Sequence, residues 1–483
     1  MTAQKSPHID MLSGSLLDKI CLFALPLAAS SILQQLFNAA DIAVVGRFAS
    51  SLALAAVGST SSSINLLVNL FVGLSVGANV VIAQLIGQNK QQNIGEAVHT
   101  VVSVALLSGV FLLVLGQFAA RPLLSLMRTP PDVIELSVRY LRIYFLGMPF
   151  VMLYNFGAAI LRSKGDSKRP LYCLTIAGVV NVLLNLLLVI VFHLSVAGVA
   201  IATVVSNMVS ASLIVSFLLR ENAPFRLSVR RLSLQKNYVL GLIKIGAPAG
   251  LQGMVFSFSN VCIQSAINAF GADAIAGSAA ANSFEAFAFF PVSAFTQACV
   301  TFTSQNYGAH QLDRCRKVFK ISLLCGIASN ILLISPFLLF RMPLLSLYST
   351  NPHVVSFGLI RMLHILPFSW VMCGYEVSAG SLRGMGHSML PAVITIFGTC
   401  IFRLLWVLAI PRGSNFAQLT AVYPASWILT TVIMLIMYAA LQNFRNALTA
   451  LPVAMRGQVL PCALRRQRLW RPSAPHARQT RRE

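Results

Sequence analysis

Long apolar runs are the feature that most constrains this chain. A helix that spans a bilayer needs about 20 apolar residues, and runs of that length recur along nearly the whole sequence, separated by short charged or Pro- and Gly-containing connectors. Hydrophobic residues make up 57% of the 483 and charged residues only 10%, so the chain lacks the polar surface of a soluble domain. We therefore predict an all-α membrane protein with about twelve transmembrane helices.

The distribution of charge predicts the topology. A net charge of +23 would fit a nucleic-acid-binding protein. Of the 36 Lys and Arg, however, eighteen fall in the connectors on the side of the N-terminus, nine in the C-terminal tail and eight in the opposite connectors. By the positive-inside rule both termini are cytoplasmic. We expect a multi-pass protein of the inner (plasma) membrane and no nucleic-acid partner.

The chain repeats itself once. Sliding the sequence along itself aligns identical residues at an offset of 222 near the start of each half and 221 further on. The pairs include Pro26 with Pro248, Asn38 with Asn260, Gln84 with Gln305, Arg162 with Arg383 and Pro170 with Pro391. Six spans per half is an even number, so both halves enter the membrane from the same side. We predict two six-helix lobes related by a parallel internal repeat, with the substrate between them.

This organisation divides the chain into five parts. We expect an N-terminal cytoplasmic segment at 1–15, an N-lobe at 16–219, a basic cytoplasmic linker at 220–238, a C-lobe at 239–441 and a basic tail, predicted to be disordered, at 442–483.

Motifs of enzymes and ATP-driven pumps do not fit. The string Gly73-Leu74-Ser75-Val76-Gly77 matches a nucleophile elbow, but that motif needs a strand-to-helix turn. Here it lies inside a predicted span, where small residues let two helices approach closely. No Walker loop occurs and the eight histidines lack metal-ligand spacing. We expect neither an enzyme nor a resident cofactor.

Ionisable groups inside a membrane are costly and are functional candidates by default. Asp41 on the first span lies about 12 Å from its outer end, at 1.5 Å per residue. Asn181 and Asn185 on the fifth span and Thr203 on the sixth fall at a similar depth. Oxygen ligands of this kind suit a proton or a small cation such as sodium. The alternative is that the amides and the hydroxyl only join helices by hydrogen bonds.

The second half has its own charged candidates. Glu285 lies on the eighth span, Glu376 on the tenth and Arg403 on the eleventh. Arg403 is about 18 Å from the cytoplasmic start of its span, where Glu376 and Glu285 are candidate partners. A structural ion pair and a place in the substrate cavity both remain open for this set.

The repeat adds two further pairs of candidates. Tyr154 and Asn155 on the fourth span match Tyr375 and Glu376 on the tenth. By this symmetry we expect the two pairs to face each other across a central cavity. Their separation should then change during transport.

These residues stand in strings that resemble the multidrug and toxic compound extrusion (MATE) family, whose superfamily includes lipid-linked oligosaccharide flippases. The resemblance covers about residues 15–445 and rests on "PLAASSILQQLFNAADIAVVGRF", "LRSKGDSKRP" with its repeat partner "LRGMGHSMLP", "VVNVLLNLLLV", "GVAIATVVSN" and "YPASWILTT". It implies two lobes, V-shaped around a central cavity, that exchange a cytosolic drug for protons or sodium ions.

The resemblance also implies a coupling site. Members with a cation site in the amino lobe use an acid on the first helix, which matches Asp41, with polar partners that resemble Asn155, Asn181, Asn185 and Thr203. Some members carry a second acid where this chain has Asn185, which puts sodium coordination at Asp41 in question. Others place a carboxylate on the seventh helix, and the seventh span here has none.

We therefore expect a secondary-active antiporter that exports amphipathic, often cationic organic compounds in exchange for protons or sodium ions by alternating access. The alternative is a lipid-linked oligosaccharide flippase of the same superfamily. A flippase for a polyanionic carrier should line its cavity with several Arg or Lys, whereas Arg403 is the clear mid-membrane cation. The expected partners are small organic substrates and membrane lipids, and we expect a monomer.

Overall fold

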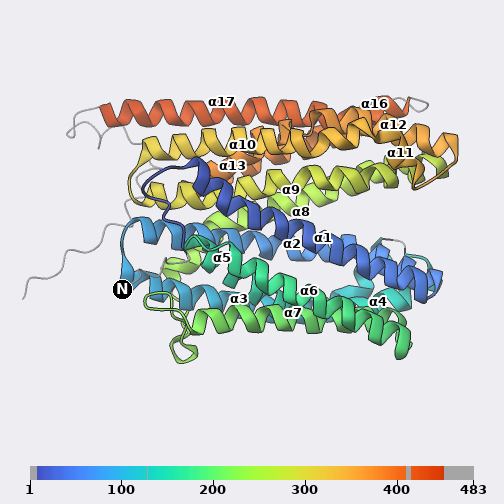
Figure 1. Ribbon diagram of the computed structural model, residues 1–483, viewed down its shortest axis with the longest axis horizontal. Helices are drawn as coiled ribbons and strands as arrows, with labels where there is room; N and C mark the ends of the chain where they lie inside the picture. The colour runs from blue at the N-terminus through green and yellow to red at the C-terminus, as the bar shows by residue number, and fades with distance from the viewer. Residues whose placement is uncertain (1–7, 128, 410–414, 451–483) are drawn as a thin grey trace, which may run out of the picture. The chain divides into compact units, whose positions relative to one another are not determined.

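Helices make up almost all of the computed structural model (Figure 1). The structure describes residues 8–127, 129–409 and 415–450, and no strand occurs among them. Ten of its helices are long and apolar enough to cross a membrane, and two bent pairs bring the number to twelve if each pair is one span. The predicted all-α fold with about twelve spans is confirmed.

The N-lobe contains seven helices and one π-helical turn. They are α1 (Leu17–Phe48), α2 (Ser51–Gly87), α3 (Gln91–Leu126), α4 (Pro131–Leu146), α5 (Met148–Ser163), α6 (Lys168–Leu186), the π turn η1 (Leu187–Val191) and α7 (Ser195–Leu219). A short 3₁₀ turn, η2 (Val229–Arg231), lies in the linker.

The C-lobe follows the same plan with more breaks. Its elements are α8 (Lys236–Asn268), α9 (Ala272–Gly308), α10 (Leu312–Leu339), α11 (Arg341–Ser346), α12 (Pro352–Ile365), the 3₁₀ turn η3 (Leu366–Phe368), α13 (Val371–Gly384), α14 (Met389–Thr395), the π turn η4 (Ile396–Ile401), α15 (Phe402–Ala409), α16 (Phe416–Thr420) and α17 (Val422–Ala450).

The chain from Leu435 onward is a separate compact unit. Its described part is the end of α17, which continues to Ala450 and so passes residue 441, where the last span was predicted to end. The rest of the predicted tail, 451–483, lies outside the described residues.

The fourth span of each lobe is bent, which the apolar runs did not indicate. The axes of α4 and α5 differ by 48° and those of the two helical segments around η3 by 47°. Pro149 begins α5 and Pro367 lies in η3. A proline has no N–H to donate to the preceding turn, so a helix breaks or kinks there.

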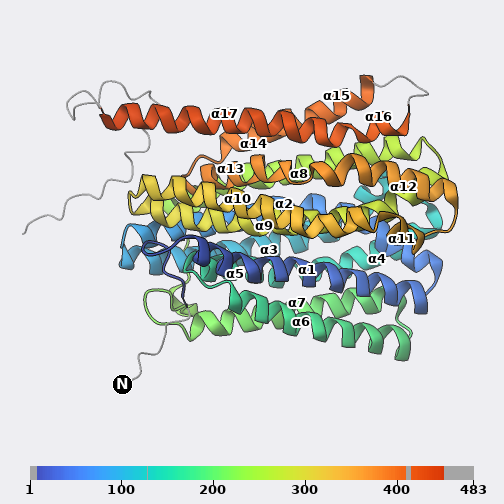
Figure 2. The ribbon, with the colours of Figure 1, turned by 45° about the horizontal axis from the view of Figure 1, so that its top comes forward.

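Glycines on α2 allow the two lobes to meet closely along α8 (Figure 2). A Cβ atom at Gly73 would lie 2.2 Å from the backbone nitrogen of Gly250, and one at Gly77 would lie 2.5 Å from the carbonyl oxygen of Leu242. Neither contact is sterically possible, so both positions require glycine at this separation. The interpretation of this string as a close helix contact is confirmed, and the nucleophile elbow is excluded.

Hydrogen bonds also join the lobes at one end of the helices. We call it the basic end; it carries residues 8–16 and the connectors 88–90, 164–167, 220–235, 309–311 and 385–388. Gln84 donates to the carbonyl of Gly384 at 2.9 Å, and Gln305 donates to the carbonyl of Ser163 at 2.6 Å. These bonds cross between the lobes, so the basic end is closed.

The segment 8–16 crosses this junction as a strap. The N–H of Ile9 donates to the carbonyl of Gly165 in the N-lobe at 3.4 Å. The carbonyl of Met11 accepts from Asn306 in the C-lobe at 3.1 Å, and the Met11 side chain is fully buried. The strap is therefore held by both lobes.

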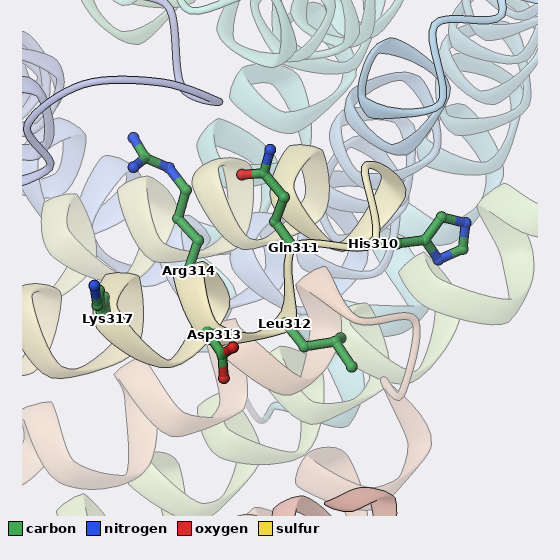
Figure 3. Close-up of a pocket in the computed structure, with 6 residues that line it drawn as sticks. All are labelled: His310, Gln311, Leu312, Asp313, Arg314 and Lys317. Carbon is green, nitrogen blue, oxygen red and sulfur yellow. The ribbon is translucent and has the colours of Figure 1, made fainter. Parts of the chain in front are cut away.

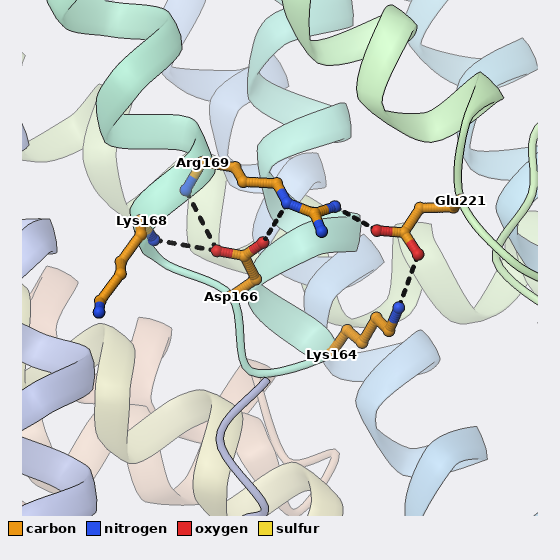
Figure 4. A network of polar contacts seen from close by, with 5 residues as sticks. All are labelled: Lys164, Asp166, Lys168, Arg169 and Glu221. Atoms are coloured by element: carbon orange, nitrogen blue, oxygen red, sulfur yellow. Dashed lines mark hydrogen bonds and ion pairs between the residues drawn. The ribbon is translucent and has the colours of Figure 1, made fainter. Parts of the chain in front are cut away.

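A network of charges anchors the linker at the basic end (Figure 4). Glu221 pairs with Lys164 at 2.7 Å and with Arg169, and Arg169 also pairs with Asp166 at 3.1 Å. Asp166 accepts from the backbone N–H groups of Lys168 and Arg169 at the start of α6. Burial raises the pKa of Glu221, but its hydrogen bonds to Lys164 and Arg169 outweigh this and hold the pKa below its ordinary value.

Candidate functional site

The N-lobe places a carboxylate against two amides. Asn185 donates from Nδ2 to Oδ1 of Asp41, and the same Nδ2 lies 3.2 Å from Oδ1 of Asn181. Asn181 and Asn185 are one helical turn apart on α6 and therefore share a face. A Cβ at Gly178 would lie 1.7 Å from the ring of Phe37, so a glycine lets α6 approach α1 here. The predicted convergence of Asp41, Asn181 and Asn185 is confirmed.

This cluster has an unused oxygen. Asn185 is fully buried, and its Oδ1 has no hydrogen-bond partner in the part of the chain that the structure describes. The π turn η1 begins two residues later, and such turns occur often at functional sites because they loosen the regular backbone bonding. A carboxylate beside an unpaired amide oxygen offers hard oxygen ligands for a proton or a small cation.

Two tyrosines on α4 belong to the same site and were missed by the sequence analysis. Tyr140 and Tyr144 pack in one cluster with Val44 and Val45, one turn of α1 after Asp41, and their rings stack with centroids 6.1 Å apart. Among the described residues, neither phenol forms a hydrogen bond with Asp41. The two tyrosines are four residues apart and so share one face of α4, and this spacing could have indicated a polar face in the sequence.

The other predicted partners of Asp41 bond within their own helices. The hydroxyl of Thr203 donates to the carbonyl of Val199 at 2.9 Å, and Asn155 donates to the carbonyl of Val151 at 2.8 Å. A polar side chain in a helix commonly takes the carbonyl four residues back when it has no better acceptor. A direct hydrogen bond from either residue to Asp41 is not formed, and their part in coupling remains a prediction.

In the C-lobe, Glu285 has a different partner from the candidate Arg403. Arg361 on α12 binds Glu285 on α9 through two parallel hydrogen bonds, Nε to Oε1 at 2.7 Å and Nη2 to Oε2 at 2.8 Å. Arg361 is only 4% exposed, although the charge count placed it in an outer connector. Glu285, a candidate partner of Arg403, is therefore paired with Arg361 instead, because α12 places the Arg361 guanidinium against it.

Arg403 lies in neutral surroundings. It donates to the hydroxyl of Ser426 at 3.0 Å and to Oδ1 of Asn260 at 3.1 Å. Its guanidinium carbon lies 4.8 Å from the ring centroid of Tyr423 and 5.3 Å from that of Phe256. None of the ion pairs in the described residues involves Arg403.

The remaining candidates are spread over the fourth and tenth spans. Tyr154 donates its hydroxyl to the carbonyl of Pro170 at 3.1 Å, and Tyr375 is buried. The charge that acts on Glu376 is that of Arg383, not Arg403. The candidate Arg403–Glu376 pair is therefore also absent from the ion pairs of the described residues. That Tyr154 and Tyr375 face each other across a cavity stays a prediction.

A surface hollow of about 360 Å³ lies at the turn between α9 and α10 (Figure 3). His310, Asp313 and Lys317 line it together with Arg314. Arg314 donates to the carbonyl of Ser13 at 2.6 Å, so it is engaged with the strap. The hollow belongs to the basic end and lies on a turn that carries none of the predicted site residues.

Both lobes match the family model named MatE, at residues 26–187 and 248–407. A probable multidrug resistance protein, YoeA of Bacillus subtilis, is 29% identical over 429 residues, which are 86% of this chain and 91% of the relative. A FAD transporter of Shewanella oneidensis is 26% identical over 322 residues, 65% of this chain and 70% of the relative.

The fold agrees with these sequence matches. An outward-facing structure of a multidrug resistance MATE family transporter of the MOP superfamily aligns with a TM-score of 0.84 and 19% identity. The alignment covers 89% of this chain and 96% of that one. One matched segment lies in each lobe of the repeat, and together they span about two thirds of the chain. This chain belongs to the MatE family of multi-pass membrane transporters and is not an enzyme.

Proposed function

We propose that this transporter is an efflux antiporter, which exports amphipathic organic compounds in exchange for protons or sodium ions. The observation that carries the proposal is the Asp41 cluster, a membrane carboxylate held by Asn185 and surrounded by neutral groups. A carboxylate in such a place changes its net charge when it binds a cation. That change is the event that couples ion entry to substrate release.

The orientation belongs to the same proposal. With the basic end in the cytoplasm, both termini and the linker are cytoplasmic, in agreement with the positive-inside rule. The lobes are then closed toward the cytoplasm by the glycine contacts of α2 and by the strap. A substrate taken up from the cytoplasm leaves from this conformation on the opposite side.

The names of the relatives support an organic substrate. One is described as a multidrug resistance protein and another as a FAD transporter. The flavin and adenine rings of FAD are aromatic, and Tyr154 and Tyr375 are among the residues predicted for the cavity. Export of such compounds is the function we assign here.

The flippase alternative is less well supported by the charges. It predicts several cations along the path of a polyanionic carrier. Arg361 is neutralised by the bidentate contact with Glu285, so Arg403 contributes the unpaired charge of this cluster. Arg162 and Arg383 also bond neutral amides, on Gln297 and Gln252, but they lie at the ends of α5 and α13 beside the basic end. A single cation farther along the path fits a small organic molecule better than a polyanion.

Transport by the purified protein in liposomes tests the proposal. Ethidium movement is followed under a pH gradient, under a sodium gradient and with neither. We expect one gradient to drive ethidium against its own concentration gradient, and the one that does so identifies the coupling ion. Passive equilibration under all three conditions would contradict antiport.

A periplasm-active reporter fused after Gln442 tests the orientation and should be silent if the basic end is cytoplasmic.

A further inference from the structure

The cluster around Arg403 lies on the C-lobe spans that correspond to those of the Asp41 cluster in the N-lobe: α8 corresponds to α1, α15 to α6 and α17 to α7. Asn181 corresponds to Arg403 at an offset of 222, and Thr203 to Ser426 at 223. A π turn lies beside the cluster in each lobe, η1 shortly after Asn185 and η4 shortly before Arg403. The two lobes therefore carry polar clusters of opposite charge on corresponding spans.

The Arg403 charge is buried without a counter-ion. The residue is 1% exposed, and Nη2 has no hydrogen-bond partner among the described residues. Its other donors bind only neutral oxygens, on Ser426 and Asn260. The other buried guanidinium of this region, Arg361, is also a cation, and Glu285 already neutralises it. An unpaired guanidinium at this depth is costly unless a ligand supplies the negative charge.

The neighbours of Arg403 indicate the shape of that ligand. Tyr423 and Phe256 place their rings against the guanidinium, and both are partly exposed, as is Asn260. A planar aromatic molecule that stacks on these rings would bring an attached oxyanion within reach of Nη2. Arginine binds carboxylate and phosphate oxygens through parallel hydrogen bonds, which suits this geometry.

We propose that the C-lobe cluster of Arg403, Asn260 and Ser426 binds the oxyanion, a carboxylate or a phosphate, of an aromatic organic substrate. This inference rests on the proposed export function and specifies its substrate class. The N-lobe cluster takes the coupling cation and the C-lobe cluster takes the anionic group of the cargo. Compounds with one negative group are then substrates, in addition to the cations expected from the sequence.

Two flavins that differ by a single phosphate provide the test. Binding of riboflavin and of flavin mononucleotide is measured by flavin fluorescence on the full-length protein in nanodiscs at equilibrium. We expect the wild-type protein to bind the mononucleotide at least about tenfold more tightly, because a charge-assisted bond contributes about that factor. No gradient is present, so a failure of antiport would leave this result unchanged.

Variants assign the preference to the cluster. Arg403→Gln should abolish it and Arg403→Lys should keep only part of it, because lysine retains the charge but lacks the planar fork. Asn260→Asp keeps the arginine and places a carboxylate beside Nη1, so it should abolish the preference without leaving an unpaired charge. Arg121→Gln, the same substitution at an exposed N-lobe position, is the matched control and should behave as wild type.

Several outcomes would overturn the proposal. These are failure of the wild-type protein to bind either flavin, equal binding of both flavins, and a preference that persists in Arg403→Gln and in Asn260→Asp. Competition by inorganic phosphate or by chloride as strong as that by the mononucleotide would show a site for inorganic anions only. The proposal would be supported if phosphate and chloride compete only weakly and if Arg403→Gln and Asn260→Asp both lose the preference for flavin mononucleotide.

Discussion

Replacing one glycine at the seam should open the basic end. In Gly73→Ala the new Cβ would lie 2.2 Å from the backbone nitrogen of Gly250, so α2 and α8 must separate by about 1 Å to reach van der Waals distance. Overpacking of this kind costs about 1–3 kcal/mol. Alanine also favours a helix by about 1 kcal/mol over glycine, but α2 is helical whether the lobes are open or closed, so that gain cancels.

The whole steric cost therefore acts on the opening equilibrium. A change of about 1–3 kcal/mol raises the open population about 5–150-fold. Hydrogen exchange by mass spectrometry follows this opening in the peptide that contains the strap, whose Met11 carbonyl accepts from Asn306 of the C-lobe. When opening is fast and reversible, the exchange rate rises in proportion to the open population.

Gly58 provides a matched control on the same helix. A Cβ there would have nothing within 4 Å, so Gly58→Ala should leave the exchange of the strap unchanged. Gly250→Ala, which would approach the Leu70 carbonyl to 2.3 Å, should act like Gly73→Ala. Equal strap exchange in Gly73→Ala and Gly58→Ala would refute the conclusion that these glycines close the basic end.

Three further substitutions test other parts of the structure. Asn185→Asp adds a second carboxylate beside Asp41, so transport should become dependent on sodium. The apparent affinity for sodium should rise at least about tenfold at fixed pH. An unchanged sodium response would contradict cation binding at this cluster. Glu221→Gln should lower the melting temperature at pH 7 by a few degrees. Because the pKa of Glu221 is held below its ordinary 4.5, its stabilisation is present above that pH and is lost as the carboxylate protonates, so the difference between the two proteins should shrink in acid. Arg361→Met leaves the buried Glu285 carboxylate without a partner and should lower the free energy of unfolding by about 3–5 kcal/mol. The double variant Arg361→Met with Glu285→Leu should recover most of that loss. Equal melting temperatures of the single and double variants would argue against the ion pair.

The sequence predicts the spans and the Asp41 cluster well, for a physical reason. Membrane helices are forced by the apolar runs, and the rise per residue then fixes depth. Depth and the helical period together were enough to bring Asn181 and Asn185 toward Asp41. The repeat supplied the equivalence of the two lobes.

Side-chain partners between helices were harder to predict. Arg361 stands near the start of a predicted span, so counting charges assigned it to a connector, and its pairing with Glu285 depends on the rotation of α12 about its axis. The apolar runs do not determine how α12 is rotated about its axis, because most residues on all of its faces are apolar. The same uncertainty applied to Thr203, whose depth matched that of Asp41 but whose hydroxyl bonds the Val199 carbonyl.

Ethidium transport by Asp41→Asn in liposomes tests the role of the coupling carboxylate most directly. An amide has the same shape, is less costly to bury and cannot change its charge, so the variant should fold and still equilibrate ethidium passively but should not respond to the coupling gradient. Asp18→Asn, the same change at an exposed position on α1, should transport as the wild type does. Gradient-driven transport by Asp41→Asn at the wild-type rate would show that Asp41 is structural.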